Sequence, residues 1–151
     1  MCKQESEIII VDDDLGHFEL IRRNLRRTGI GNPIVSITSG NDALDYVFCR
    51  GKHAGRTSGT EIVMLLDINM PGGMDGLEVL RQIKNDARTK RLPVVMLTTA
   101  DDRREIDFCY ELGCKVYVTK PADPSALIDA IQRVGLLFSI VSIPSIEEVS
   151  S

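Results

Sequence analysis

The chain has 151 residues, 43% of them hydrophobic and 26% charged, and its formal net charge at pH 7 is −4. These values are typical of one globular domain with a buried core, and they argue against a nucleic-acid surface, which is usually basic. The sequence has no apolar stretch that could span a membrane, and its short acidic N-terminus does not resemble a signal peptide, so we expect a cytoplasmic protein without nucleic-acid or membrane partners.

Short apolar runs alternate with helical patterns along the chain. The first run, residues 8–11, is β-branched and too short for a helix, so it predicts a buried strand. Residues 15–28 follow with apolar side chains at helical spacing, and this helix is expected to end before Gly29. Residues 34–37 predict the second strand, after which Asn41 is expected to cap the next helix.

The same alternation continues through the rest of the chain. The most apolar predicted strand is residues 62–66, directly before Asp67. Helices and strands are then predicted in turn over residues 77–85, 93–97, 103–112 and 115–118. Pro124 begins a last predicted helix, at a position where proline is tolerated.

Strands that alternate with helices in this way predict an α/β protein with a parallel sheet covered on both faces. Because crossovers are right-handed and the chain is short, we expect a flavodoxin-like, doubly wound (βα)5 sandwich whose strand order is 2-1-3-4-5. One domain would occupy residues 7–138. Residues 139–151 would form an apolar C-terminal extension and a polar tail, so we expect no effector domain.

The four cysteines show no zinc-binding spacing. Cys109 and Cys114 lie within apolar patterns, where a free cysteine behaves as a small hydrophobic residue. We therefore expect reduced thiols.

Ligands of such sheets bind where the strands end. The polar residues at the predicted strand ends are Asp12, Asp13, Asp67, Asn69, Thr98 and Lys120. Each has an ordinary structural explanation when taken alone, and Asp14 is well explained as a helix cap. Several carboxylates at close quarters repel one another unless a cation lies between them, and oxygen ligands with room for water suit Mg²⁺.

The combination predicts phosphoryl transfer, a reaction that depends mainly on positioning and on electrostatic stabilisation of the transferred oxygens. Asp67 is the predicted nucleophile. The expected Mg²⁺ ligands are Asp13, Asp67 and the backbone carbonyl of Asn69, with Asp12 acting through water. The groups expected on the phosphoryl oxygens are the Thr98 hydroxyl, the Lys120 ammonium and the backbone amides after Asp67.

Ordered motifs connect the sequence to a known family. They are V-D-D-D at residues 11–14, L-L-D-I-N-M-P at 65–71, M-D-G at 74–76, P-V-V-M-L-T at 93–98 and K-P at 120–121. Over almost the whole chain they resemble the receiver domains of two-component response regulators. The resemblance implies that Asp67 accepts a phosphoryl group from a sensor histidine kinase. It also implies that the chain is not an enzyme beyond self-phosphorylation and self-dephosphorylation.

The resemblance also assigns the remaining site residues. Asp12 and Asp13 would be the acidic pair of the family, Thr98 the switch hydroxyl, Tyr117 the switch aromatic and Lys120 the switch lysine, with a cis peptide before Pro121. Residues 93–120 and the apolar ending at 136–144 look like the small response regulators that are paired with bacterial phytochromes. The partner kinase would then be of the phytochrome type.

Two features bear on assembly and on phosphate lifetime. Residues 136–143 are nearly all apolar, more than one helical face can bury, which predicts a homodimer through the last helix and this tail. The alternative is a tail that folds back on its own domain.

Two glycines separate Pro71 from Met74 where many receivers have one residue, so the loop is longer and the phosphate lifetime is left open.

Three other interpretations remain. The segment 12–14 also fits the D-x-D start of haloacid dehalogenase-like phosphatases, although Gly16 is unusual there and the Asp67 segment would have no role. A phosphorylation-independent adaptor would keep the fold without using the site. A flavin-binding electron carrier is disfavoured by aspartates in the place where a phosphate would bind.

Overall fold

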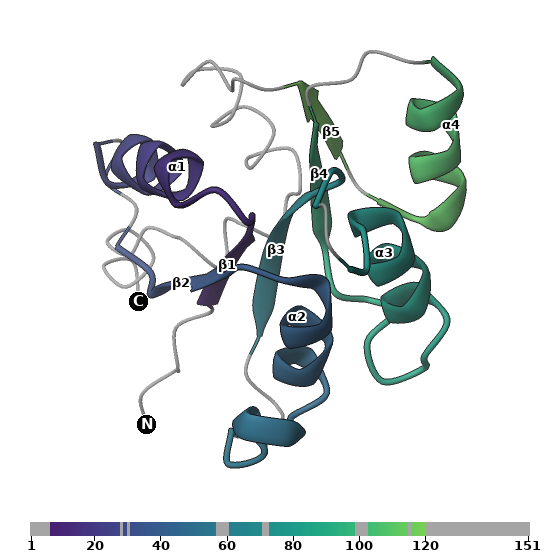
Figure 1. Ribbon diagram of the computed structural model, residues 1–151, viewed down its shortest axis with the longest axis horizontal. Coiled ribbons are helices and arrows are strands. Elements are labelled where there is room, and N and C mark those ends of the chain that lie inside the picture. Colours follow the sequence, from purple (N-terminus) through teal and green to yellow (C-terminus); the bar gives the residue numbers. More distant parts are fainter. Residues whose placement is uncertain are drawn as a thin grey trace, which may run out of the picture.

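A five-stranded parallel sheet forms the centre of the protein (Figure 1). The computed structural model describes residues 7–27, 29, 31–56, 61–70, 73–98, 103–114 and 116–119. The strands are β1 (Glu7–Val11), β2 (Ile34–Ile37), β3 (Ile62–Asp67), β4 (Val94–Thr98) and β5 (Val116–Thr119). Their order in the sheet is β2-β1-β3-β4-β5, which confirms the predicted flavodoxin-like topology.

Helices connect the strands and cover both faces of the sheet. They are α1 (Leu15–Arg27), α2 (Gly40–Val47), the 3-10 helix η1 (Gly51–His53), α3 (Gly76–Lys84) and α4 (Arg103–Leu112). In Figure 1, α1 lies on one side of the sheet, and α2 and α3 lie on the other. None of the helices in the described ranges has the length and apolarity needed to cross a membrane. The last predicted helix and the C-terminal extension lie outside these ranges.

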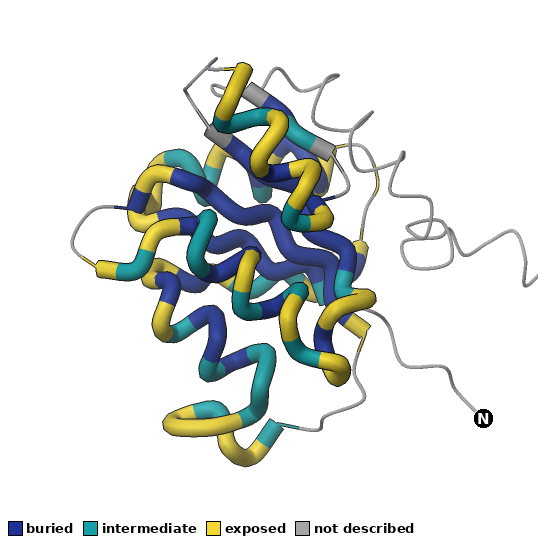
Figure 2. Tube along the Cα trace, turned by 90° about the vertical axis from the view of Figure 1, so that its right-hand side faces the viewer, coloured by how far each residue is buried: buried dark blue, intermediate teal, exposed yellow. Residues whose placement is uncertain are grey.

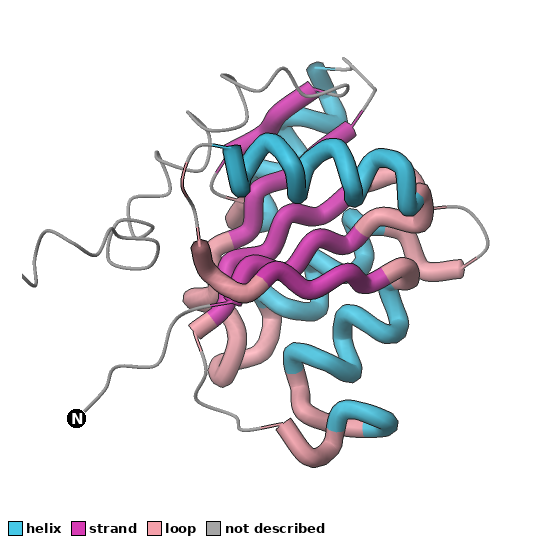
Figure 3. Tube along the Cα trace, turned by 90° about the vertical axis from the view of Figure 1, so that its left-hand side faces the viewer, coloured by secondary structure: helices cyan, strands magenta, loops and turns pink. Residues whose placement is uncertain are grey.

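Successive side chains of a strand point to opposite faces of the sheet, and here both faces are buried. On one face, Ile10 packs in a cluster with Leu25 of α1. On the other face, Ile9 packs in a cluster with Leu80 of α3. Figure 2 shows the strands buried beneath helices whose outward positions are exposed, and Figure 3 shows the same sheet from the opposite side. Burial on both faces explains why the strand segments read as continuous apolar runs without polar alternation.

The start of α2 differs from the prediction. The residue that caps this helix is Ser39, whose side chain accepts a hydrogen bond from the backbone N–H of Asp42 at 3.1 Å, and not Asn41. The helix therefore begins at Gly40. A Cβ atom at this position would lie 2.8 Å from the carbonyl oxygen of Met74, so the close approach between α2 and the segment before α3 requires glycine.

The described cysteines are free, as expected. Cys109 is fully buried, and Cys114 is 6% exposed. The N–H of Cys114 donates to the carbonyl of Cys109 at 3.1 Å, across a turn in which Gly113 has a φ of +107° and ends α4. The two thiols thus belong to the apolar core, while Cys2 lies outside the described residues.

Tyr46 connects α2 to the start of β1. Its hydroxyl donates a hydrogen bond to Oε1 of Glu7 at 2.6 Å, and the guanidinium of Arg56 lies 4.0 Å above its ring. Burial, followed by the hydrogen bond and the charge of Glu7, raises the pKa of Tyr46 to about 12. Because a hydrogen bond to a charged acceptor contributes about 1.5 kcal/mol or more, we expect Tyr46→Phe to lower the free energy of unfolding by roughly that amount.

The same contact predicts a pH dependence. The folded pKa lies above the ordinary value of 10.0, so the stabilisation is complete below pH 10 and is lost as the pH rises toward 12. Urea unfolding should show the difference between the wild type and Tyr46→Phe shrinking across this window. The exposed Tyr110, changed to Phe, is the matched control. A difference that stays constant from pH 8 to pH 12 would contradict a role for the hydroxyl.

Candidate functional site

The strand register brings acidic residues of β1 and β3 together. Val11 is the partner of Leu66 across this parallel pair, so the next residues, Asp12 and Asp67, stand side by side where the strands end. Asp12 is 1% exposed and Asp67 is 3% exposed. Burying two carboxyl groups at one place costs folding free energy. Stability therefore does not explain their position, which indicates a functional site at this edge of the sheet.

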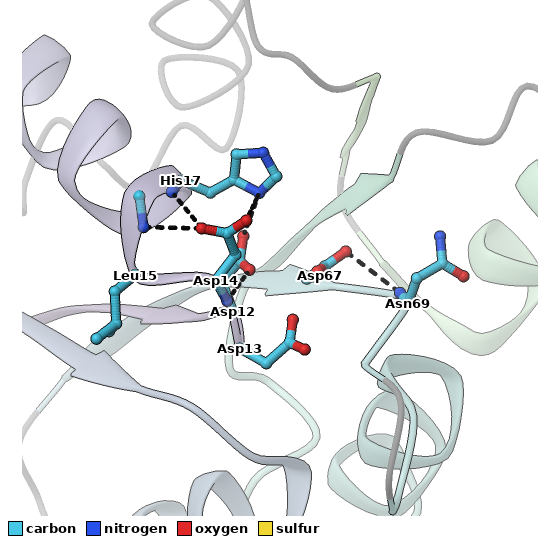
Figure 4. Close-up of a pocket in the computed structure, with 8 residues that line it drawn as sticks. Asp12, Asp13, Asp14, Leu15, His17, Asp67 and Asn69 are labelled. Atoms are coloured by element: carbon cyan, nitrogen blue, oxygen red, sulfur yellow. Dashed lines mark hydrogen bonds and ion pairs between the residues drawn. The ribbon is translucent and has the colours of Figure 1, made fainter.

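Asp13 completes an acidic cluster with these two residues. One carboxylate oxygen from each of Asp12, Asp13 and Asp67 lies within 4.8 Å of the others. Figure 4 shows the three side chains gathered at a pocket of about 670 Å³, which Asn69 also lines. Ionised carboxylates at such distances repel one another, and a divalent cation removes that repulsion. The ligand atoms of this cluster are all oxygens, the donor set that suits Mg²⁺ and Mn²⁺.

Backbone amides orient both buried carboxylates. Oδ1 of Asp12 accepts a hydrogen bond from the N–H of Asp14 at 2.9 Å, and Oδ1 of Asp67 accepts one from the N–H of Asn69 at 3.2 Å. In each case an aspartate bonds the amide two residues further along the chain, the usual Asx-turn geometry. The two carboxylates are therefore held in position before any ligand arrives, as electrostatic catalysis requires.

The start of α3 lies directly against Asp67. The N–H of Gly76 donates to the carbonyl of Ile68 at 3.0 Å, and a Cβ atom at residue 76 would lie 2.3 Å from the carbonyl oxygen of Asp67. Asp75 caps the helix by accepting a backbone N–H at 3.0 Å. Asp75 and Gly76 of the M-D-G motif at 74–76 are thus explained by the local structure, as helix cap and close-packed glycine. The helix begins one residue earlier than predicted.

His17 lines the pocket, although the sequence analysis did not single it out. It lies in the first turn of α1, where Asp14 accepts its backbone N–H at 3.2 Å and caps the helix as predicted. Its ring atom Nδ1 lies 3.7 Å from Oδ2 of both Asp12 and Asp14. The available signal was its spacing, because a side chain in the first turn of a helix leans back over the strand end that precedes it.

The remaining predicted site residues are only partly described. Thr98 ends β4, one position beyond the partner of Asp67, so its backbone lies at the same edge of the sheet. Tyr117 of β5 is half-buried against the larger core cluster. The side chain of Thr98 lies outside the described part of the structure, and so do Lys120 and Pro121.

Known proteins share this fold and this sequence pattern. Residues 8–132 match the sequence profile of the response regulator receiver domain. The chain is 30% identical over 127 residues to the response regulator Rcp1 of Synechocystis, a match that covers 84% of each chain. The Mn²⁺-bound form of Rcp1 has a TM-score of 0.71 at 28% identity, covering 93% of this chain and 99% of that one.

Two further solved structures are phytochrome response regulators. RtBRR, a bacteriophytochrome response regulator, has a TM-score of 0.82 at 31% identity, and the match covers 98% of this chain and 88% of the RtBRR chain. The phosphorylated cyanobacterial phytochrome response regulator RcpA has a TM-score of 0.73 at 30% identity, and the match covers 95% of this chain and 100% of the RcpA chain. Together with the profile match, the parallel sheet and the acidic cluster, they show that the chain belongs to the family of response regulator receiver domains.

Proposed function

We propose that this chain is a single-domain response regulator, with its receiver domain at residues 7–138, and that Asp67 accepts a phosphoryl group from a sensor histidine kinase. The observation that carries the proposal is the position of Asp67. It is 3% exposed at the end of the central strand β3, and the carboxylates of Asp12 and Asp13 lie within 4.8 Å of its own. Burying these carboxylates together lowers the stability of the fold. The arrangement is explained if it binds a cation and a phosphoryl group.

In the proposed transfer, a carboxylate oxygen of Asp67 forms a bond to phosphorus while the phosphorus–nitrogen bond of the kinase phosphohistidine breaks. The histidine ring keeps the electron pair of that bond and takes up a proton. The N–H of Asn69, 3.2 Å from Oδ1 of Asp67, holds the carboxylate in orientation for this step. Most of the acceleration would come from such positioning and from neutralised charge.

The proposed ligands of Mg²⁺ are Asp13, Asp67 and the backbone carbonyl of Asn69, with Asp12 acting through water. When bound there, the cation neutralises the carboxylates and the incoming phosphoryl group. The Mn²⁺-bound form of the relative Rcp1 supports a divalent cation at this site. The oxygen-only cluster supports it independently.

The response to phosphorylation would involve residues at the ends of β4 and β5. We assign the Thr98 hydroxyl and the Lys120 ammonium to the phosphoryl oxygens, and Tyr117 to a rotamer change that follows Thr98. The cis peptide expected before Pro121 belongs to the same proposal. The position of Thr98 at the carboxyl edge, one residue beyond the partner of Asp67, is consistent with its assigned role.

The proposed partner is a sensor histidine kinase of the phytochrome type. The similarity to RtBRR and RcpA, which are phytochrome response regulators, supports this choice. The signal would leave the domain through protein–protein contacts.

We also propose a homodimer through the last helix and the apolar tail, which lie outside the described residues. Sedimentation of dilute samples should show the full chain as a dimer and a chain ending at Gly135 as a monomer. The expected cause is the loss of the apolar segment at 136–143. If both chains sediment as monomers, the tail folds back on its own domain and the dimer is wrong.

Intact mass after incubation with acetyl phosphate and Mg²⁺ tests the proposed function. We expect the addition of one phosphoryl group, and none when EDTA is present. A haloacid dehalogenase-like phosphatase would instead turn over a phosphate monoester continuously, which p-nitrophenyl phosphate would reveal. A folded protein whose mass does not change would favour the phosphorylation-independent adaptor.

A further inference from the structure

The ring of His17 has a buried nitrogen atom at the edge of the acidic cluster. Its Nδ1 is inaccessible to solvent and makes no hydrogen bond with any of the described residues, although 39% of the side chain is exposed. The acidic oxygens facing it are Oδ2 of Asp12 and Oδ2 of Asp14, each at 3.7 Å. Buried polar atoms in native proteins nearly always have a hydrogen-bond partner, so this atom calls for an explanation.

Asp12 is the better partner for this nitrogen. Its side chain is 1% exposed, whereas that of Asp14 is 56% exposed and accepts backbone N–H groups at the start of α1. Oδ1 of Asp12 already accepts the N–H of Asp14, and Oδ2 is the oxygen that faces His17 (Figure 4). The gap exceeds a hydrogen bond by about half an ångström, which is within the ordinary amplitude of side-chain motion.

We propose that His17 is a positioning residue of the cation site. Its Nδ1–H donates to Oδ2 of Asp12 and fixes this carboxylate, which holds the cation through water. The inference rests on the proposed function, because it assumes that Asp12, Asp13 and Asp67 hold a divalent cation. Hydrogen bonds to a ligating group orient that group for the metal, and their loss usually lowers metal affinity about 10- to 100-fold.

Direct ligation by the imidazole is the competing arrangement. Among the described residues, the atoms that lie within 4.8 Å of one another are carboxylate oxygens of Asp12, Asp13 and Asp67, and His17 does not belong to this group. An imidazole ligand would also change the metal preference toward Ni²⁺ or Zn²⁺, whereas a positioning residue would affect Mg²⁺ and Mn²⁺ alike. The two roles therefore differ in a measurable property.

A pair of substitutions can separate the two ring nitrogens. The amide nitrogen of asparagine lies close to the place of Nδ1, and the amide nitrogen of glutamine reaches the place of Nε2. His17→Asn therefore keeps a donor toward Asp12, and His17→Gln removes it. The exposed Leu20 on the same helix, changed to alanine, is a control that leaves the pocket intact.

The measurement is the dissociation constant for Mn²⁺, Mg²⁺, Ni²⁺ and Zn²⁺, by calorimetry at fixed pH and salt without a phosphoryl donor. We expect His17→Gln to weaken the binding of Mn²⁺ and of Mg²⁺ about tenfold, near the low end of the usual range, because the ring is partly exposed. His17→Asn and Leu20→Ala should stay close to the wild type. Urea unfolding without metal should be the same for all variants. At saturating Mg²⁺, acetyl phosphate should phosphorylate His17→Gln at the same rate as the wild type.

Three results would overturn the inference while leaving the proposed function intact. They are equal affinity in His17→Gln, tighter binding in that variant, and a loss confined to Ni²⁺ and Zn²⁺. A wild-type protein that binds neither Mn²⁺ nor Mg²⁺ would overturn the cation site itself, and with it this inference. The two failures are therefore distinguishable in one set of titrations.

Discussion

Asp67→Asn is expected to abolish phosphorylation by acetyl phosphate, with a loss in rate of at least about 10³-fold, as for other nucleophile deletions. The amide has no anionic oxygen to attack phosphorus, and it also removes one charge from the cation site formed with Asp12 and Asp13. Intact mass over time, at the same Mg²⁺ concentration as for the wild type, measures the loss.

Asp75→Asn is the matched control for this change. Asp75 is exposed and caps α3 by accepting a backbone N–H, a role that asparagine performs equally well. Phosphorylation of this variant should therefore match that of the wild type. If Asp67→Asn were labelled to the wild-type extent, the acceptor would have to be another carboxylate of the cluster, Asp12 or Asp13.

Gly76→Ala is expected to lower the free energy of unfolding by about 3 kcal/mol, the upper part of the usual range for overpacking. The added Cβ would lie 2.3 Å from the carbonyl oxygen of Asp67 and 2.8 Å from Cα of Ile68. Both contacts are with backbone, which cannot rotate away as a side chain can. We therefore expect α3 or the end of β3 to shift, and phosphorylation to slow because Asp67 shifts with it.

Gly73→Ala provides the comparison in the same connecting segment. Apart from the neighbouring positions, no atom of the described residues would lie within 4 Å of a Cβ atom at residue 73, so this variant should unfold within about 1 kcal/mol of the wild type. Urea denaturation of the two variants and the wild type tests the contrast. Equal stability of Gly76→Ala and Gly73→Ala would mean that the contact between α3 and β3 is looser than the structure shows.

The sheet could be predicted from the sequence because its strands are buried on both faces. β2 and α4 have the predicted bounds, residues 34–37 and 103–112. β1 and β3 are each one residue longer than predicted at one end, and β4 and β5 are each shifted by one residue toward the C-terminus. β4, for example, begins after Pro93 because proline has no N–H to donate to the neighbouring strand.

The cluster of Asp12, Asp13 and Asp67 was also predictable, because parallel strands end at a common edge. Contacts between elements distant in sequence were not predictable. Ser39 caps α2 in place of the predicted Asn41 where Gly40 meets the segment before α3. Such contacts depend on three-dimensional packing that periodicity does not encode. The place of His17 in the pocket, by contrast, could have been inferred from its spacing, because the first turn of α1 directly follows the end of β1.

Mapping the phosphorylated residue tests the central claim most directly. The wild-type protein would be incubated with acetyl phosphate and Mg²⁺, reduced with borohydride, which converts an aspartyl phosphate to homoserine, and digested for peptide mass spectrometry. We predict homoserine at position 67 alone, and none when EDTA is present. Homoserine at Asp12 or Asp13, or unmodified Asp67 in a protein that has gained a phosphoryl group, would contradict the account.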